Sequence, residues 1–168
     1  PSLRGTKMLV GVISDTHVPN AAPSLPAKVL ALFHGVGLIL HAGDLVVLDV
    51  LEELQRIAPV TAVRGNMDSR EVVAALPERT VVEVGGFRIG VTHGSGTPVG
   101  LAERVWSEFR NEGVNAIVFG HSHAACREER DGVLLLNPGS PTDRRFTKSN
   151  SVGLLGVTDR LTFKIIPV

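Results

Sequence analysis

The sequence is poor in cysteine, in large aromatic residues and in net charge. Its 168 residues include one cysteine, one tryptophan and no tyrosine, and 17 basic side chains balance 17 acidic ones. A lone cysteine, Cys126, excludes a disulfide framework and favours a cytoplasmic location. A neutral chain lacks the clustered positive charge that binds duplex nucleic acid, and scarce aromatics disfavour stacking on single strands. We therefore expect neither a disulfide-rich secreted protein nor a nuclease for long nucleic acid.

Long apolar runs are also missing. No run approaches the roughly 20 residues of a membrane-spanning helix, and the first residues lack a signal-peptide apolar region of adequate length. We therefore expect no membrane partner. The chain is 43% hydrophobic, which suits a single domain over residues 1–168. Residues 1–7 precede the first expected strand and are either a native extension or a remnant of cloning.

The first half of the chain alternates between strand and helix patterns, which predicts parallel βαβ units. Nearly continuous apolar runs indicate strands that are covered on both faces. Ser24 has the position of a helix N-cap, with Pro26 in the first turn. The expected strands are 8–13, 36–40 and 60–63, and the expected helices run from Ser24 to about Phe33 and over about 47–57.

The second half predicts antiparallel arms and one more helix. Two strand patterns, 80–84 and 87–92, flank a Gly-Gly pair that is typical of a two-residue hairpin. Thr97-Pro98 predicts the N-cap and first residue of a helix that Gly113 ends. A strand at 115–119 follows. Hairpin turns at Asp131-Gly132 and Asp159-Arg160 complete a pattern that favours two packed sheets with helices outside.

Residues 117–123 read IVFGHSH, a buried strand that runs into two histidines. Side chains two apart in an extended backbone point the same way, so His121 and His123 should leave the strand side by side. Neutral imidazole is a common ligand for Zn, Mn, Fe and Ni. Taken alone, the motif is explained equally well by one histidine that caps a turn and one that is solvated.

Five expected strands run into loops that carry potential metal ligands. Ligands in open α/β sheets bind beyond the carboxyl ends of the strands. Together the loops offer four imidazoles, two carboxylates and one amide oxygen, which is too many for one tetrahedral ion and suits two. No cysteine belongs to the set, so a thiolate zinc site is excluded. The candidate ligands are Asp15, His17, Asp44, Asn66, His93, His121 and His123.

In this order, the motifs resemble those of the calcineurin-like metallophosphoesterase superfamily. They are Asp15-x-His17, Gly43-Asp44, Gly65-Asn66-x-Asp68, His93-Gly94 and Gly120-His121-x-His123. The chain length, the 25–28 stretch (LPAK) and the 137–140 loop (NPGS) are similar to its small prokaryotic phosphodiesterase branch. That branch is itself similar to the scaffold subunit of the retromer complex. The resemblance implies an α/β fold: a four-layer αββα sandwich of two mixed β-sheets flanked by helices.

The resemblance also implies two divalent transition-metal ions. We expect Mn²⁺, with Zn, Fe or Ni as alternatives. A hydroxide bridging the two ions would attack phosphorus in line. The predicted catalytic residues are Asp44, Asn66 and His93. The first ion would be held by Asp15, His17, Asp44 and His123, and the second by Asp44, Asn66, His93 and His121, so that Asp44 bridges.

The predicted function is a metal-dependent phosphodiesterase acting on a small phosphodiester substrate. The alternative is a retromer-like interaction scaffold with weak or no turnover, although a scaffold has no reason to keep four imidazoles at these strand ends. The sequence leaves open the physiological substrate, the native metal and whether the chain forms a homo-oligomer.

Four other polar or flexible residues have two interpretations each. Met67 stands where many relatives have a histidine that is thought to protonate the leaving oxygen. Either the site lacks that proton donor, since a thioether donates no proton, or Met67 merely packs in the loop. His41 is either a partner of a metal ligand or, preferably, a hydrogen-bonded core histidine. Arg144 and Arg145 either reach a phosphate or a neighbouring subunit, or lie in a solvated loop.

Overall fold

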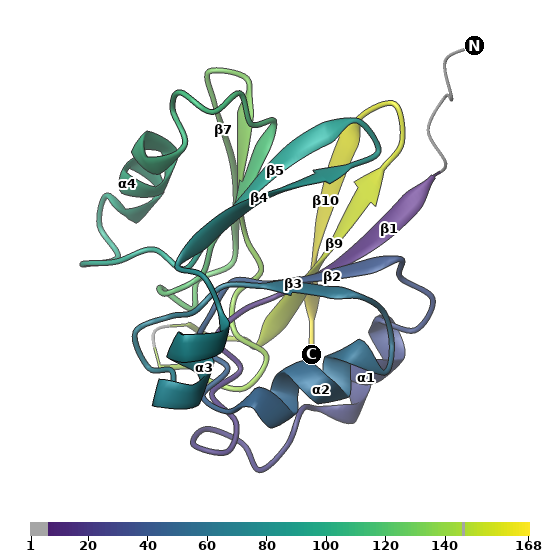
Figure 1. The fold of residues 1–168 in the computed structure, drawn as a ribbon, viewed down its shortest axis with the longest axis vertical. Helices are drawn as coiled ribbons and strands as arrows, with labels where there is room; N and C mark the ends of the chain where they lie inside the picture. The colour runs from purple at the N-terminus through teal and green to yellow at the C-terminus, as the bar shows by residue number, and fades with distance from the viewer. Residues whose placement is uncertain (1–6, 146) are drawn as a thin grey trace.

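Two five-stranded β-sheets face each other in the computed structural model, which describes residues 7–145 and 147–168 (Figure 1). Residues 1–6 of the expected extension lie outside the described residues. The first sheet has the order β10-β9-β1-β2-β3 and the second has the order β4-β5-β6-β8-β7. The first sheet consists of β1 (Met8–Ile13), β2 (Leu38–His41), β3 (Val60–Ala62), β9 (Ser151–Val157) and β10 (Leu161–Pro167). The second consists of β4 (Arg79–Val84), β5 (Phe87–Thr92), β6 (Ala116–Val118), β7 (Cys126–Arg130) and β8 (Val133–Asn137).

Both sheets are mixed. Strands β1, β2 and β3 are parallel, as the alternating pattern predicts, while β9 runs antiparallel to β1 and β10 antiparallel to β9. In the second sheet β5, β6 and β8 are parallel, and the antiparallel strands β4 and β7 lie at its edges. The parallel strands therefore bring their carboxyl ends to one edge of each sheet.

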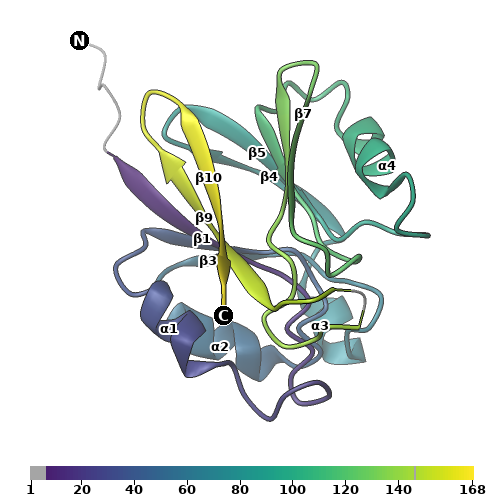
Figure 2. The same ribbon diagram turned by 180° about the vertical axis from the view of Figure 1, so that it is seen from behind.

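Apolar side chains fill the space between the sheets and the space under the helices. Val12 and Leu40 from the first sheet meet Val91 and Leu136 from the second in one buried cluster. The outer face of the first sheet packs against α1 (Ala27–Leu32), α2 (Leu48–Gln55) and α3 (Arg70–Ala75), and that of the second against α4 (Leu101–Glu108). Figure 2 shows these helices on opposite sides of the sheet pair. The predicted four-layer αββα sandwich is confirmed.

The helix starts differ from the predictions. The N-cap of α1 is Pro26 rather than Ser24, and it makes no side-chain capping bond. Helix α4 begins after Gly100, whose φ of 75° is left-handed, because the Thr97 hydroxyl donates to the Val99 carbonyl and closes a turn there. The predicted start at Thr97-Pro98 was therefore wrong, and α4 ends at Glu108, before the predicted end at Gly113.

Three further boundaries were missed or displaced. Helix α3 was not predicted, because six residues are too few to show a 3.6-residue period; Ser69 caps it by accepting from the Val72 amide at 3.4 Å. Strand β2 begins at Leu38 rather than residue 36 and includes His41, and α2 is shorter than predicted.

The predicted hairpin turns are confirmed. Gly85-Gly86 and Asp131-Gly132 both have positive φ at their two central residues, as a type I′ turn requires. In the part of the chain that the structure describes, no helix has the length and apolar character needed to cross a membrane.

Candidate metal centre

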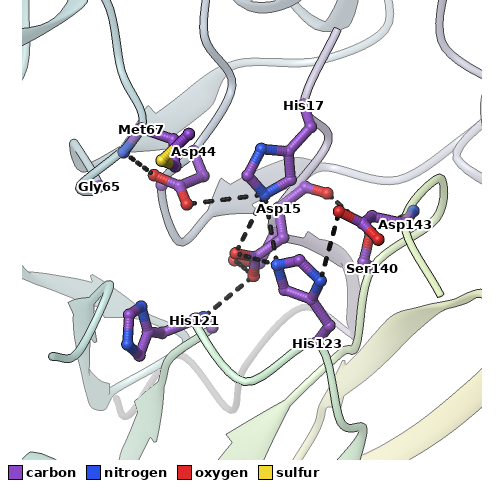
Figure 3. A network of polar contacts seen from close by, with 12 residues as sticks. Asp15, His17, Asp44, Gly65, Met67, His121, His123, Ser140 and Asp143 are labelled. Atoms are coloured by element: carbon purple, nitrogen blue, oxygen red, sulfur yellow. Dashed lines mark hydrogen bonds and ion pairs between the residues drawn. The ribbon is translucent and has the colours of Figure 1, made fainter. Parts of the chain in front are cut away.

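The seven candidate ligands come together where loops of the two sheets meet. Loops after β1, β2 and β3 carry Asp15, His17, Asp44 and Asn66, and loops after β5 and β6 carry His93, His121 and His123. Figure 3 shows Asp15 and His17 from the first sheet and His123 from the second pointing toward one another. All seven side chains that were predicted from the strand ends therefore lie in one region.

The first group of donors consists of Asp15, His17 and His123, all buried. Asp15 Oδ1 lies 3.3 Å from His123 Nε2 and 3.7 Å from His17 Nε2, and the two imidazole nitrogens lie 3.3 Å apart. Three donor atoms that face one another at these distances form a pocket of the size that one cation needs.

The second group consists of Asn66, His93 and His121 and is more open to solvent. The Asn66 amide oxygen lies 3.0 Å from His93 Nε2 and 3.2 Å from His121 Nδ1, and the two imidazole nitrogens are 3.3 Å apart. Asn66 is exposed and His121 is half-buried, whereas His93 is buried. A ligand from solution would therefore reach this group from the Asn66 side.

Asp44 lies between the two groups. Its Oδ2 is 3.6 Å from His17 Nε2 and 3.2 Å from His93 Nε2, as a bridging carboxylate requires. Asp15 is also shared, since its Oδ1 is 3.9 Å from His93 Nε2 and it forms a second carboxylate–histidine cluster with Asp44 and His93. The resemblance assigned Asp15 to the first ion alone, whereas in the structure Asp15 lies near donors of both groups.

Backbone carbonyls select the imidazole nitrogens that face the centre. His93 Nδ1 is 2.8 Å from the Ala42 carbonyl and His121 Nε2 is 2.7 Å from the Gly96 carbonyl. A carbonyl only accepts, so each of these nitrogens carries the hydrogen and donates it. His93 Nε2 and His121 Nδ1 are then the nitrogens that offer lone pairs to a cation.

The buried Asp15 carboxylate fits a cation. Its Oδ2 accepts from the Ser14 hydroxyl at 2.7 Å and from the His121 amide at 3.0 Å. Its Oδ1 is buried and has no hydrogen-bond partner among the described residues. A buried charged oxygen without a donor is costly. Oxygen and nitrogen donors without a thiol suit two divalent cations of the Mn, Fe, Ni or Zn type.

Protons compete with cations for this centre. Burial acts to raise the pKa of Asp15, but the neighbouring His123 and His17 imidazoles outweigh it and hold that pKa well below its usual value. Burial acts to lower the pKa of His93, yet Asp44 and the charge of Asp15 raise it to about 9. The pKa of His17 is also raised, because Asp15 outweighs burial. A protonated His93 imidazole thus supplies part of the positive charge that cations would supply.

Five of the seven candidate ligands hold a left-handed backbone conformation. This conformation costs non-glycine residues energy and gathers at functional sites. The φ values are 54° at Asp15, 44° at His17, 59° at Asp44, 72° at His121 and 58° at His123. The sequence motifs indicated the side chains but gave no sign of this strain.

Asp68 fastens two of the ligand loops together. Its carboxylate accepts from the amides of Asp44 at 3.1 Å, Val46 at 2.6 Å and Gly65 at 2.7 Å. The Met67 amide in turn donates to Asp44 Oδ1 at 2.8 Å (Figure 3). Asp68 therefore shapes the loop after β2 and the loop after β3.

The end of β8 and the loop after it form hydrogen bonds to the loops that carry Asp15 and His121. The Ser140 hydroxyl donates to the Asp15 carbonyl at 2.7 Å, and the Asn137 amide group donates to the Gly120 carbonyl at 3.1 Å. The same loop places Asp143 Oδ2 3.8 Å from His123 Nδ1 (Figure 3). A carboxylate on this side of the ring favours the orientation in which Nε2 faces the metal position. Asp143 was missed in the sequence, because only the folded position of its loop brings it near His123.

His41 is a buried structural histidine, as preferred from the sequence. Its Nδ1 accepts from the Gly43 amide at 3.1 Å, and its Nε2 lies 3.1 Å from the Thr16 hydroxyl. Complete burial lowers its pKa to about 3, so the ring is neutral. The side chain ties the loop after β1 to the loop after β2.

Two cavities adjoin the centre. The larger, of about 740 Å³, is lined by Asn66 and His93 together with Arg64 and Arg79. The smaller, of about 300 Å³, is lined by His17, Met67, Arg144 and Arg145. Met67 is half exposed, so its side chain belongs to a cavity wall rather than to the core.

Comparison with known proteins agrees with this geometry. The family model described as "Calcineurin-like phosphoesterase superfamily domain" matches residues 8–160. A "probable metallophosphoesterase" from Methanothermobacter thermautotrophicus is 40% identical over 159 residues, which cover 95% of this chain and 92% of the relative. Vps29 from Entamoeba histolytica, solved in complex with zinc, has a TM-score of 0.78 and 27% identity over 95% of this chain and 99% of its own. A structure described as a novel archaeal phosphodiesterase has a TM-score of 0.75 and 25% identity over 96% of this chain and 100% of its own.

Proposed function

The chain belongs to the calcineurin-like phosphoesterase superfamily, and on that premise we propose that it is a metal-dependent phosphodiesterase that uses two divalent cations. Manganese as the resident metal, a small phosphodiester as the substrate and a cytoplasmic location are parts of the same proposal. The archaeal structural relative that is described as a phosphodiesterase supports the choice of a diester.

The observation that carries the proposal is the position of Asp44. One of its oxygens lies within 3.6 Å of a nitrogen from each histidine group, which supports a role for this carboxylate as a ligand shared by two cations. Two cations close together repel, and a shared carboxylate reduces that repulsion. A site built for a single ion would not need seven donors arranged on both sides of Asp44.

The chain's own residues would bind the cations, neutralise part of their charge and orient the phosphate group. When bound, the cations would supply a hydroxide nucleophile near neutral pH and take up charge that develops on the phosphoryl oxygens. Asp15 and Asp44 supply two negative charges to hold them. Asn66 lies at the solvent-exposed side and would orient the phosphate group that enters there, next to His93. Asp68 and Ser140 hold the ligand loops in place.

The second candidate is an interaction scaffold with little turnover. The observation that favours it is the TM-score of 0.78 to Vps29. That relative was itself solved with zinc, so metal binding alone does not separate the two functions. Turnover does separate them, and the cavities beside the metal centre, together with the intact donor set, favour the enzyme.

The test combines metal analysis with a substrate panel. Purified protein is stripped with a chelator, reloaded with Mn²⁺, Zn²⁺, Fe²⁺ or Ni²⁺, and analysed for bound metal per chain. Each form is assayed with bis-p-nitrophenyl phosphate, p-nitrophenyl phosphate and cyclic nucleotides. We expect two ions per chain and diester hydrolysis that depends on metal. Absence of turnover above the stripped protein with every metal and substrate would favour the scaffold.

A further inference from the structure

We propose that the smaller cavity binds a nucleotide-like substituent of the diester that carries a second phosphate group. The proposal rests on the phosphodiesterase function and narrows its substrate class. His17 belongs both to the metal centre and to the wall of this cavity, so a group bound there is attached next to the reacting phosphate. The charges that line the two cavities indicate which of them can bind a second phosphate group.

Among the described residues that line the larger cavity, neither arginine is unpaired. Arg64 Nη1 lies 3.3 Å from the carbonyls of Val73 and Leu76, and Nη2 is 3.8 Å from Glu78. The Arg64 guanidinium group is therefore already bound by two carbonyls and one carboxylate of the protein.

Arg79, the second arginine of this cavity, is engaged as well. It donates to the Glu108 carbonyl at 3.0 Å, pairs with Glu112 and stacks on Phe109 with its guanidinium carbon 4.7 Å from the ring centroid. Glu78 and Glu108 also line the cavity and would repel a second anion.

The smaller cavity has an excess of positive charge. Within the described residues, the Arg144 side chain is exposed and has no hydrogen bond or ion pair. Arg145 is 67% exposed on its side chain and shares one carboxylate, Asp143, at 3.6 Å. The lining thus holds two guanidinium groups and one carboxylate, and only Arg145 is paired with that carboxylate, which leaves the Arg144 guanidinium available for a phosphate oxygen.

The rest of this wall suits a flat ring. Met67 is 50% exposed, and a thioether side chain contacts aromatic rings favourably. Ala21 adds apolar surface and Asn20 adds a hydrogen-bonding amide. A volume of about 300 Å³ is at the lower end of small-molecule sites. One base and sugar with a terminal phosphate combine the required ring, size and charge.

The loop that carries the arginines is held in place. The Thr142 hydroxyl donates to the Thr16 carbonyl at 2.7 Å, and the Asp143 amide donates to the Ser140 hydroxyl at 2.9 Å. Binding would therefore order the two arginine side chains without first having to order the loop. The reaction itself is hydrolysis: water adds across one P–O bond and gives a phosphomonoester and an alcohol.

The test uses substrates that differ by one phosphate. The thymidine dinucleotide dTpdT and its 5′- and 3′-phosphorylated forms are compared as substrates of the Mn²⁺-loaded protein, and their binding is measured by calorimetry. We expect the wild type to prefer one phosphorylated form by about tenfold in kcat/KM and in affinity, since charge-assisted contacts at partly exposed sites are of this order. Arg144→Gln should reduce the preference to about threefold or less, and Arg144→Gln with Arg145→Gln should remove it.

Arg160→Gln is the matched control. Arg160 lies in the turn between β9 and β10, and that turn adjoins the start of β1, opposite the strand end that carries Asp15. This variant should keep the wild-type preference. If the wild type binds and cleaves all three dinucleotides equally, or if the double variant keeps the preference, the subsite proposal is wrong while the phosphodiesterase proposal stands. If no diester is cleaved, the phosphodiesterase proposal fails, and the calorimetric preference still decides whether the arginines bind the added phosphate.

Discussion

At the scale of single residues, Asp44 divides its two oxygens between structure and chemistry. Oδ1 accepts from the Met67 amide, and Oδ2 faces His17 and His93. Asparagine can keep the first contact while losing the charge. We therefore expect Asp44→Asn to abolish hydrolysis of bis-p-nitrophenyl phosphate. His17→Ala or Asn66→Ala should mainly weaken one ion, by about 10–100-fold in affinity.

The measurement for Asp44 is kcat as a function of Mn²⁺ concentration for all three variants. Excess Mn²⁺ should restore part of the activity of His17→Ala and Asn66→Ala, because their defect is one of affinity. It should not restore Asp44→Asn. Turnover at the wild-type rate in Asp44→Asn at saturating Mn²⁺ would rule out the bridging role.

Met67 occupies the position where we expect the proton donor for the leaving oxygen to be missing. A general acid commonly contributes about 10²–10⁴-fold, most of all with poor leaving groups, and a thioether cannot act as one. Turnover should therefore depend steeply on leaving-group pKa across a graded series of diesters. Met67→His should flatten that dependence if Asp68, which now binds three loop amides, can also orient the ring. A flat dependence in the wild type, with chemistry rate-limiting, would mean that another proton donor operates.

At the scale of strands and loops, the sequence predicted the strands better than the helix ends. Continuous apolar runs such as 8–13 and the two-residue turns are strong local signals, and they fixed the sheets. Helix starts depend on which of several competing local hydrogen bonds forms. The Thr97 hydroxyl, for example, closes a turn with the Val99 carbonyl instead of capping α4. The ligands were predictable because parallel strands end at one edge. Asp143 was not, because only the tertiary position of its loop brings it near His123.

The approach of two ligand loops depends on Gly120. A Cβ atom there would lie 1.9 Å from the Ser14 hydroxyl and 2.5 Å from Asp15 Oδ2. Gly120→Ala must therefore push the loop after β6 away from the loop after β1. We expect a loss of about 1–3 kcal/mol in the free energy of unfolding, as for other overpacked sites, and weaker metal binding. Gly37→Ala is the control, because its Cβ would meet only the flexible Met8 side chain.

Urea unfolding and Mn²⁺ titration of both glycine variants would check this. Gly37→Ala should stay close to the wild type in both measurements. Equal metal affinity in Gly120→Ala and in the wild type would show that the loops can separate without moving the ligands.

At the scale of the whole molecule, the proposed metal centre joins the two sheets. The first sheet contributes Asp15, His17, Asp44 and Asn66, and the second contributes the other three ligands. Cations bound only by the folded state stabilise it, by about 2.7 kcal/mol per site at 100 times the dissociation constant. We expect Mn²⁺ to raise Tm by roughly 5 °C or more for a chain of this size. Calorimetric scans with Mn²⁺ and with chelator would measure this, and identical Tm values would contradict a site shared between the sheets.

Stability at acid pH should depend on His41, which is buried and neutral. Its pKa is about 3 in the folded state and 6.5 as the ordinary value. Between these values the unfolded chain takes up a proton that the folded chain refuses, so the free energy of unfolding rises with pH. Stability from this group is present above pH 6.5 and is lost as pH falls toward 3. The slope reaches at most about 1.4 kcal/mol per pH unit.

His41→Asn isolates this contribution, because an asparagine oxygen can still accept from the Gly43 amide. The raised pKa values of His17 and His93 act in the opposite sense and above pH 6.5, and the lowered pKa of Asp15 acts at more acid pH; all three are present in both proteins. We therefore expect the wild type to be the more stable protein at pH 7.5 and the difference to shrink steadily toward pH 4.5. Urea unfolding in the presence of chelator gives both curves. Parallel curves would show that the buried ring accepts a proton in the folded protein without cost, and they would contradict the prediction.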